Sequence, residues 1–479
     1  MRVVMIGTGY VGLVSGACFA DFGHHVTCID KDAAKIDALR RGILPIYEPG
    51  LDLLVESNVR DGRLTFATEA DAVSEADLVF LAVGTPSRRG DGHADLTYVY
   101  AAAAEVAELL RGYTVIVTKS TVPIGTGDEV EAIVRKVAPD ADVDIASNPE
   151  FLREGAAIGD FKRPDRVLVG VESERAEATL RELYRPLYLN ETPLIVTDRR
   201  TAELTKYAAN AFLATKIAFI NEVADLCETT GANVQHVARA IGLDKRIGGK
   251  FLHPGPGYGG SCFPKDTLAL SRTAQLAERP ITIVDAVIAA NARRKNAMAE
   301  RVVEAAGGSV HGTTIAILGL TFKPNTDDMR EAASLVIVPA LQTAGANVRV
   351  FDPEGMEEAG KFLTGVTFTN GVYECLEGAD IAVILTEWDQ FRALDLARVA
   401  SLLRRKILVD LRNIYPLDQP ARAGLDYRSI GRPRPGVAAR AVAAAKAAPG
   451  PAEPTVEPKP SAGIAASGER PDAVDQPFA

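Results

Sequence analysis

The sequence predicts an α/β fold class, with two doubly wound domains joined by a helical central region that contains a long connecting helix. Three observations indicate this. Short β-branched apolar runs alternate with helical patterns over the first 195 or so residues, a long helical pattern runs from Thr201 to about Thr230, and the alternation returns between residues 312 and 430. Such alternation is typical of βαβ units and parallel sheets. The expected strands are Arg2–Ile6, His25–Asp30, Leu78–Val83, Thr114–Lys119, Asp144–Ser147, Val167–Val171, Thr314–Leu318, Asn347–Phe351, Ile381–Leu385 and Ile407–Leu411.

The chain is expected to divide into two or three domains, because its 479 residues are too many for one hydrophobic core. The helical patterns at 201–230 and about 280–306 separate the two α/β parts. After about Arg432 the composition changes to Ala, Pro, Gly and charged residues, which cannot bury enough apolar surface to offset the entropy of ordering. We expect an N-terminal domain at 1–200, a central region at 201–306, a C-terminal domain at 307–432 and a disordered tail at 433–479.

Composition restricts the possible partners and the compartment. A net charge of −10 disfavours a nucleic-acid partner, which would require a basic face. The N-terminus becomes glycine-rich after four apolar residues, unlike a signal peptide, and no apolar run reaches the 18–20 or so residues of a membrane helix. We therefore expect no membrane association and a cytoplasmic location.

The five cysteines are too few and too scattered for a disulfide framework. Four of them, Cys18, Cys28, Cys227 and Cys375, lie in apolar segments and are expected to be core residues. No Cys/His cluster has the spacing of zinc ligands, so no metal site is expected.

A glycine motif follows the first strand and opens a helix expected at Leu13–Phe22. In Gly7-Thr-Gly-Tyr-Val-Gly12 the glycines allow a tight turn, close approach of a pyrophosphate and close helix–strand packing. Asp30 ends the next strand, where a carboxylate bonds ribose hydroxyls and repels a 2′-phosphate, so NAD is favoured over NADP. Lys35 either supports the ribose or is a solvated charge. The domains are thus expected to be Rossmann-like, with cofactor contacts from Gly7, Gly9, Val11, Gly12, Asp30 and Lys35.

Two further motifs end strands at the carboxyl edge of the same sheet, where open α/β folds bind ligands. Val83-Gly-Thr-Pro-Ser87 contains Thr85, and Lys119-Ser-Thr-Val-Pro123 contains Thr121. Thr85 is expected to contact the cofactor. Thr121 either bonds the nicotinamide or a catalytic water, or caps the next helix.

The segment Gly255-Pro-Gly-Tyr-Gly-Gly-Ser-Cys-Phe-Pro-Lys-Asp266 places Cys262 in a glycine-rich loop with Lys265 and Asp266 directly behind it. A cation beside a thiol favours the thiolate, which is the nucleophilic form. Cys262 is therefore a candidate nucleophile, and the alternative is a structural turn with a bystander cysteine.

Polar residues in three other segments are candidates for the same site. Glu150 and Glu154 follow an Asn-Pro turn at a strand end, where acids can serve in acid/base catalysis. Lys206 and Asn210 are four residues apart in the long helical pattern, so they share one helix face, which either lines a pocket or forms an exposed edge.

In the second α/β part, Gly319 occupies the position that Gly7 has in the first. Lys323 and Arg330 follow it as cations suited to phosphate contacts.

Taken together, these motifs resemble the UDP-glucose/GDP-mannose dehydrogenase family of nucleotide-sugar dehydrogenases. The resemblance covers nearly everything from Met1 to about Arg432, and the sequences GTGYVG, GTPS, STVP, NPEFLREG, ELTKYAAN, FLHPGPGYGGSCFPKD and GLTFKPNTDDMR occur in the family's order. Sequence around the cysteine resembles the UDP-glucose branch. The GDP-mannose and UDP-hexosamine branches, a hydroxyacid dehydrogenase that releases one NADH per product, and a non-catalytic NAD- or nucleotide-sugar-binding regulator are the alternatives.

The resemblance implies the oxidation of a primary alcohol to a carboxylate by two NAD⁺. Cys262 would capture the intermediate aldehyde as a thiohemiacetal, which a second oxidation converts to a thioester for hydrolysis. Lys206 and Asn210 would stabilise negative charge on the sugar oxygen. Asp266, Thr121, Glu150 and Glu154 compete for the role of directing the hydrolytic water.

The resemblance also implies the residues that bind ligands. Thr121, Glu154, Lys265 and Arg330 would join the cofactor contacts. Arg246 matches an arginine that family members lend from a neighbouring subunit, which implies a homodimer or larger homo-oligomer packed through the long helix. The segment His253-Pro-Gly-Pro is one variant of a loop that differs across the family, and the tail after Arg432 is not shared. The expected substrate contacts are Glu150, Phe151, Leu152, Arg153, Glu154, Lys206, Asn210, Arg246, Phe251, Leu252, His253, Pro254, Gly255, Gly259 and Lys323.

Overall fold

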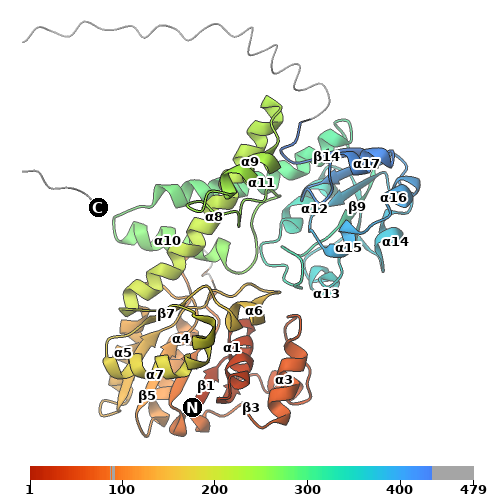
Figure 1. Cartoon of the computed structure of the whole chain (residues 1–479). Coiled ribbons are helices and arrows are strands. Elements are labelled where there is room, and N and C mark those ends of the chain that lie inside the picture. The colour runs from red at the N-terminus through yellow and green to blue at the C-terminus, as the bar shows by residue number, and fades with distance from the viewer. Residues whose placement is uncertain (87, 89–91, 434–479) are drawn as a thin grey trace, which may run out of the picture.

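The computed structural model describes residues 1–86, 88 and 92–433 and contains two β-sheets connected by long helices (Figure 1). The tail expected at 433–479 lies outside the described residues from 434 onward, and so does Ser87 of the Val83–Ser87 motif. Within the described residues, no helix is long and apolar enough to cross a membrane.

The first sheet has eight strands in the order β3-β2-β1-β4-β5-β6-β7-β8. Its first six positions have the doubly wound order: strands are added in one direction from β1 to β3 and in the other from β4 to β6. Ligands of such sheets bind at the carboxyl ends of the strands, beside the point between β1 and β4 where the order changes. The strands are β1 Arg2–Ile6, β2 His25–Ile29, β3 Leu64–Ala67, β4 Leu78–Leu81, β5 Thr114–Thr118, β6 Val143–Ser147, β7 Val167–Gly170 and β8 Leu194–Thr197.

Two features of this sheet differ from the sequence-based expectation. The alternation predicted a parallel sheet, but β6 and β7 pair antiparallel through Ser147 and Gly170. The strands β3 and β8, each four residues long, were not predicted. Helices cover both faces of the sheet (Figure 1). They are α1 Tyr10–Asp21, α2 Ala33–Arg40, α3 Leu51–Arg60, η1 Asp71–Glu75, α4 Thr97–Leu109, α5 Thr126–Val137, α6 Ala157–Lys162, α7 Glu174–Leu183 and η2 Arg185–Asn190.

The second sheet has six parallel strands in the order β11-β10-β9-β12-β13-β14, which repeats the doubly wound order of the first. The four strands expected here are present, whereas β11 and β14 were not predicted: β11 has two residues, and β14 reads Asp-Tyr-Arg-Ser without an apolar run. The elements are β9 Thr314–Leu318, α12 Ser334–Thr343, β10 Asn347–Phe351, α13 Met356–Gly360, β11 Thr367–Phe368, α14 Val372–Leu376, β12 Ile381–Ile384, α15 Asp389–Arg392, α16 Leu396–Leu402, β13 Ile407–Asp410, α17 Asp418–Arg422 and β14 Asp426–Ser429.

Each sheet is buried on both faces, as its continuous apolar strands predict. In β1, Val3 and Met5 belong to one hydrophobic cluster and Val4 belongs to another. In β9, Ile315 and Ala316 are divided in the same way. The four cysteines expected in the core are buried, and all five cysteines are free thiols.

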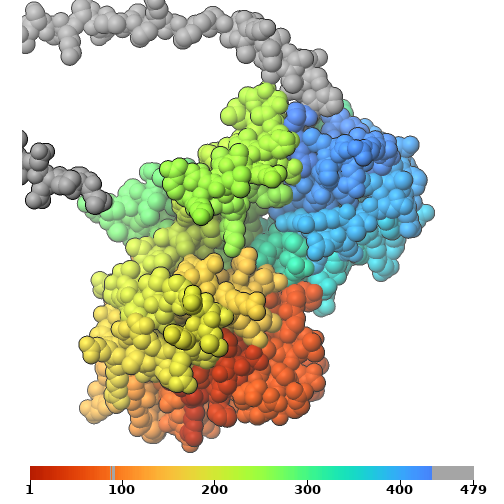
Figure 2. Space-filling view, viewed as in Figure 1, coloured from red at the N-terminus to blue at the C-terminus, as the bar shows by residue number. Residues whose placement is uncertain are grey.

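The long predicted helix is present as α8, which spans Arg199–Thr230 and runs between the two sheets (Figure 1). Asp198 caps it, because its side chain accepts a hydrogen bond from the backbone N–H of Thr201. The remaining central helices are α9 Val234–Gly242, α10 Phe263–Leu276 and α11 Thr282–Ala305. In the space-filling view, the first sheet's domain, the central helices and the second sheet's domain contact one another around the middle of the molecule (Figure 2).

Candidate active site

The dinucleotide turn predicted at Gly7–Gly12 joins β1 to α1. Gly7 has φ of +103°, and a Cβ on Gly12 would lie 1.9 Å from the carbonyl oxygen of Gly7, so both positions require glycine. Gly9, in contrast, faces open space and is the N-cap of α1 without a side-chain cap bond. The start of α1, including Val11, therefore presents backbone N–H groups and a positive dipole end, which is the cradle that a pyrophosphate fits.

Asp30 stands at the end of β2 beside this turn. Its carboxylate accepts hydrogen bonds from the backbone N–H and the hydroxyl of Thr8 at 3.0 and 2.7 Å, and from Lys35 Nζ at 2.9 Å. Burial alone would raise the pKa of Asp30, but these hydrogen bonds outweigh burial and lower it to about 2. A permanently ionised acid at this position suits NAD rather than NADP, and Lys35 is paired with Asp30 rather than free in solvent.

The two other loops at this edge are tied together. Thr85 Oγ1 donates to the carbonyl oxygen of Thr121 at 3.0 Å, and Ser120 Oγ donates to that of Val83 at 2.6 Å. Thr121 does not cap the following helix, because the N-cap of α5 is Gly125.

The helix face that carries Lys206 and Asn210 lines the site, so the alternative of an exposed helix edge is excluded. Lys206 is 3% exposed, and its Nζ lies 3.1 Å from Oε1 of Glu150. Asn210 is 6% exposed and donates from Nδ2 to Oδ2 of Asp266 at 2.6 Å. Lys206 thus pairs with Glu150, and Asn210 bonds Asp266, so two successive turns of α8 face the same polar centre.

Cys262 is the N-cap of α10, so its thiol sits at the positive end of a 14-residue helix and is partly accessible. Burial raises the pKa of this thiol, and Lys206 is the main influence that lowers it. Lys265, the cation that directly follows the loop, instead donates to Oδ1 of Asp266 at 2.6 Å. The expectation that Lys265 is the cation beside the sulfur is therefore corrected: Lys206 has that place.

Glu154 joins all three parts of the molecule. Its Oε1 accepts hydrogen bonds from Ser261 Oγ at 3.1 Å and from Arg330 Nη2 at 3.3 Å. Burial raises the pKa of Glu154 to about 7, Asp328 adds to that rise, and Arg330 and Lys323 oppose it. Its other oxygen, Oε2, is buried without a hydrogen-bond partner among the described residues.

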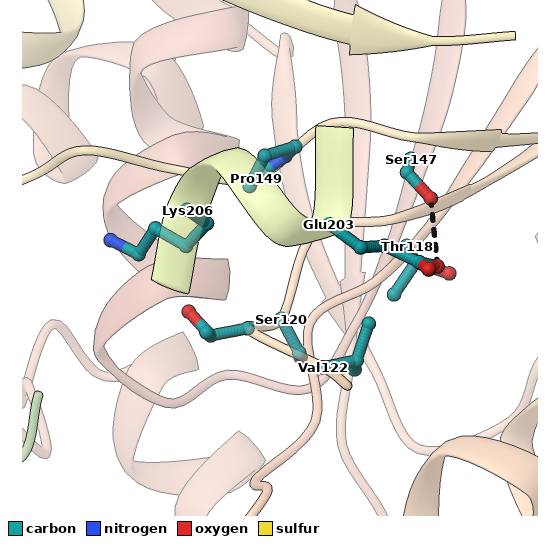
Figure 3. A pocket seen from close by; sticks show the side chains of 8 residues that line it. Thr118, Ser120, Val122, Ser147, Pro149, Glu203 and Lys206 are labelled. Atoms are coloured by element: carbon teal, nitrogen blue, oxygen red, sulfur yellow. Dashed lines mark hydrogen bonds between the residues drawn. The ribbon is translucent and has the colours of Figure 1, made fainter. Parts of the chain in front are cut away.

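A small cavity lies between α8 and the ends of β5 and β6 (Figure 3). In this view Glu203 and Lys206 leave the same stretch of α8 in opposite directions, and Glu203 reaches Ser147. Thr121 of the β5 loop and Lys206 of α8 both line this cavity. Its lining residues are Thr118, Ser120, Thr121, Val122, Ser147, Pro149, Glu203 and Lys206.

The segments expected to bind substrate lie around the same centre. Phe151 stacks beneath the guanidinium of Arg166 at 3.5 Å and also faces Lys206 at 5.2 Å. Leu152 donates its backbone N–H to Glu150, whereas Arg153 turns outward to Asp160.

The loop before the cysteine contacts both the central helices and the second domain. Phe251 packs edge-on against Phe263, Leu252 is buried, and His253 contacts the carbonyl oxygen of Arg412. After Pro254, Gly255 donates to Asn221.

Close backbone packing explains two glycine positions. A Cβ on Gly259 would lie 2.3 Å from the carbonyl oxygen of Glu331, and one on Gly155 would lie 2.4 Å from that of Asn325. Burial lowers the pKa of Lys323, which is on the same loop as Asn325, and the nearby charges of Glu154 and Cys262 oppose that shift.

Arg246 is a predicted substrate residue for which no contact with the other site residues is found within the described part of the chain. Its side chain is 89% exposed and is paired with Asp244 of its own loop. Its proposed role in a neighbouring subunit stays a prediction.

Sequence reasoning missed several residues that build the site. Lys119 is buried and donates to Asn148 Oδ1 at 2.9 Å, just ahead of Glu150. Glu48 accepts backbone hydrogen bonds from Gly155 and Ala157, and Arg412 lies against Gly255. These partners are separated by 29 to 157 residues, so no local pattern could have indicated them.

The loop that follows β9 in the second domain has the backbone geometry of the dinucleotide turn, but its acid is already bonded within the protein. Gly7 and Gly319 both have positive φ, and each donates its N–H to the last residue of the neighbouring strand, Ile29 or Phe351. Asp352 corresponds to Asp30, but it is 1% exposed and accepts bonds from the backbone of residues 320, 321, 354 and 355 and from Trp388. This acid stabilises the loop and is not available to a ribose.

The UDP-glucose/GDP-mannose dehydrogenase family matches in three parts: its NAD binding domain at residues 1–188, its central domain at 200–293 and its UDP binding domain at 316–417.

Individual relatives extend the comparison. A UDP-glucose 6-dehydrogenase of Rhizobium meliloti is 62% identical over 90% of this chain and 100% of its own length. A solved UDP-glucose dehydrogenase of Pyrobaculum islandicum superposes with a TM-score of 0.82 at 39% identity, covering 91% of this chain and 97% of that one. The UDP-D-ManNAc dehydrogenase of Pyrococcus horikoshii has a TM-score of 0.79 at 27% identity, covering 90% and 99%. The chain therefore belongs to the UDP-glucose/GDP-mannose dehydrogenase family.

Proposed function

We propose that this chain oxidises UDP-glucose to UDP-glucuronate with two NAD⁺, through covalent intermediates on Cys262. The observation that supports this most is the polar centre at which Cys262, Lys206, Asn210 and Asp266 meet beside a dinucleotide turn. A simple alcohol dehydrogenase has no use for a thiol nucleophile at that place.

The roles of the site residues follow from their positions. When bound, NAD⁺ accepts a hydride in each of the two oxidations. Lys206 and Asn210 would stabilise the negative oxygen at C6 of the sugar, since both point a donor into a buried site where charge is poorly solvated. The thiolate of Cys262 would then add to the aldehyde, which keeps the aldehyde from escaping before the second oxidation.

The hydrolytic water requires a nearby acid or hydroxyl. Asp266 is fixed between Asn210 and Lys265, and Glu150 is fixed by Lys206, so both carboxyl groups have defined orientations. Thr121 borders the same cavity as Lys206. We assign the positioning of that water to this group of residues.

The division of labour between the three parts is also proposed. Residues 1–200 would bind NAD through Gly7, Gly9, Val11, Gly12, Asp30 and Thr85. Residues 201–306 would supply the thiol, and residues 307–432 would hold the UDP group through Lys323 and the neighbouring loops. Lys265 and Arg330 would approach the cofactor. All five cysteines are free thiols, which supports a reducing compartment such as the cytoplasm.

Substrate identity is tested by stoichiometry. Purified protein is supplied with UDP-glucose, GDP-mannose or a UDP-N-acetylhexosamine, and NADH is followed by absorbance. The expected result is two NADH per UDP-glucose consumed. UDP-glucose is preferred over UDP-N-acetylmannosamine because the relatives named for UDP-glucose are closer in sequence, at 62% and 39% identity against 27%. No NADH from UDP-glucose would contradict the proposal, and one NADH per product would indicate a two-electron dehydrogenase.

We further infer that two copies of this chain pack through α8. Phe212, Phe219 and Leu226 are 66%, 54% and 61% exposed and recur every seven residues, so they form one apolar stripe on the helix. Such a stripe is costly to leave in water. F219E should convert the assembly to monomers in light scattering, whereas Y188E, a change at an exposed tyrosine elsewhere, should not. An F219E protein of unchanged mass would contradict the interface.

A further inference from the structure

The serine that precedes the nucleophile has contacts that the proposed function does not use. Ser261 Oγ lies 3.5 Å from Cys262 Sγ and 3.1 Å from Oε1 of Glu154. A hydroxyl can donate one hydrogen bond and accept another at the same time. Ser261 is therefore placed to connect the thiol with a carboxylate.

We infer that Ser261 relays the proton of the Cys262 thiol to Glu154, so that Glu154 is the base that generates the nucleophile. This inference rests on the proposed role of Cys262 as the attacking group. It assigns Glu154 to activation of the thiol, and it leaves Glu150, Asp266 and Thr121 for the hydrolytic water.

The thiol needs such a base because the groups around it shift its pKa in opposite directions. Burial raises the pKa of Cys262, Lys206 opposes that rise, and Glu150 and Asp266 add to it, so that the pKa is raised overall. Lys323 and Arg330 also lie within electrostatic range of the sulfur. A thiol in that condition is mostly protonated at neutral pH and reacts only when a nearby group accepts its proton.

Glu154 has the properties of that acceptor. It is held by the hydroxyl of Ser261 and by Arg330, and it faces Asp328 and Lys323 from the second domain and Tyr10 from α1. Burial raises its pKa to about 7, which is near the value at which a carboxyl group both accepts and releases a proton at neutral pH. The relayed proton arrives at Oε1, the oxygen that Ser261 already contacts, while Oε2 has no hydrogen-bond partner among the described residues.

The step balances in atoms and charge. The S–H bond of Cys262 breaks as its sulfur bonds to the aldehyde carbon, the thiol proton moves to Ser261 Oγ, and the hydroxyl proton of Ser261 moves to Glu154. The aldehyde oxygen takes the electron pair and stays as an alkoxide at Lys206 and Asn210. When hydride leaves that carbon for NAD⁺, the oxygen re-forms a carbonyl group as the thioester, and Glu154 then releases its proton to solvent.

The relay also couples the thiol to the arrangement of the molecule. Glu154 follows β6 of the first sheet, Ser261 precedes α10, and Arg330 belongs to the loop after β9. The carboxylate can meet the hydroxyl only when the first domain and the central loop are in contact, and Arg330 holds it there.

Alkylation of Cys262 tests the relay without substrate. Full-length wild type, S261A, E154Q and S261T are treated with iodoacetamide from pH 6 to 10, and the label on Cys262 is quantified by peptide mass spectrometry. The other four cysteines are buried. Alkylation at pH 7 is expected to slow about tenfold in S261A and E154Q and to remain within twofold of wild type in S261T, which keeps the hydroxyl.

A second serine provides the matched control. Ser271 is buried on α10 and, like Ser261, donates to a carboxylate, in this case that of Asp285, but its hydrogen bonds do not involve Cys262. S271A should alkylate like wild type. Alkylation of S261A within twofold of wild type, or equal slowing in S271A, would overturn the relay.

Steady-state kinetics provide the second readout. S261A should lower kcat about tenfold and leave KM for UDP-glucose within threefold, because the hydroxyl acts on the sulfur rather than on sugar binding. An unchanged kcat would contradict the relay. Wild type that makes no NADH from UDP-glucose would instead refute the proposed function, while the alkylation result would still stand.

Discussion

Lys206 and Glu150 form an ion pair 3.1 Å long in which both side chains are more than nine-tenths buried. The two residues are 56 positions apart, one on α8 and one after β6. Removing one member of such a buried pair strongly destabilises the fold, because the remaining charge is left in a poorly solvated place.

The pair predicts different effects on stability and on activity. K206M and E150Q should each lower the free energy of unfolding by about 3 kcal/mol, whereas the double variant K206M/E150Q should recover most of that loss because no lone charge remains. Activity should fall at least 100-fold in K206M and stay low in the double variant, since the cation beside Cys262 is still missing. Urea unfolding and NADH assays measure the two effects. Restored activity in the double variant would show that Lys206 is only structural.

Replacement of the thiol should separate the two oxidations. In C262S the poorer nucleophile leaves the aldehyde uncaptured, so we expect steady-state turnover to fall by at least 100-fold while UDP-glucose binding by calorimetry stays within threefold. Rapid-quench analysis should show the aldehyde or a trapped adduct. Cys227, buried away from the site, gives the control C227S with normal turnover. Near-normal rates in C262S would refute the thioester route.

Glu154 should make stability depend on pH. Its pKa is about 7 in the folded chain and near 4.5 when unfolded, so the folded state binds this proton more tightly. Its effect on stability is therefore favourable below about pH 4.5 and is lost as the pH rises to 7. Between pH 5 and 8 the melting temperature of wild type should fall relative to that of E154Q, which cannot titrate. Parallel curves for the two proteins would show that the carboxyl group is not perturbed.

We expect the side chain of Glu203 to cap the N-terminus of α5, because the N-cap residue of that helix is a glycine. Gly125 caps that helix without a side chain, and Glu203 of α8 accepts the backbone N–H groups of Gly125 and Gly127 at 2.6 and 2.8 Å. E203A leaves both donors unsatisfied, so we expect a loss of about 2 kcal/mol of unfolding free energy. Turnover should fall with it, because the Thr121 loop leads directly into α5.

Arg200 offers a matched control on the same helix. It pairs with Asp128 of α5 but is 70% exposed, so R200A should lower the free energy of unfolding much less than E203A does. Equal losses in E203A and R200A would mean that the buried cap has no special role.

The sequence by itself determined both doubly wound sheets, the long helix, the dinucleotide turn and the set of polar motifs. These depend on local properties: apolar periodicity, glycines that permit positive φ, and the strand–glycine–helix–strand–acid order. The sequence did not predict β3, β8, β11 and β14; β11 has only two residues, and β14 has no apolar run.

Only the tertiary structure decided which charges meet. Lys265 adjoins Cys262 in sequence but turns to Asp266, while Lys206, 56 residues away, is the cation that acts on the sulfur. Glu154 meets Ser261 across 107 residues. Side-chain pairing depends on how distant segments approach one another and on how much solvent they exclude, and a linear pattern does not contain that information.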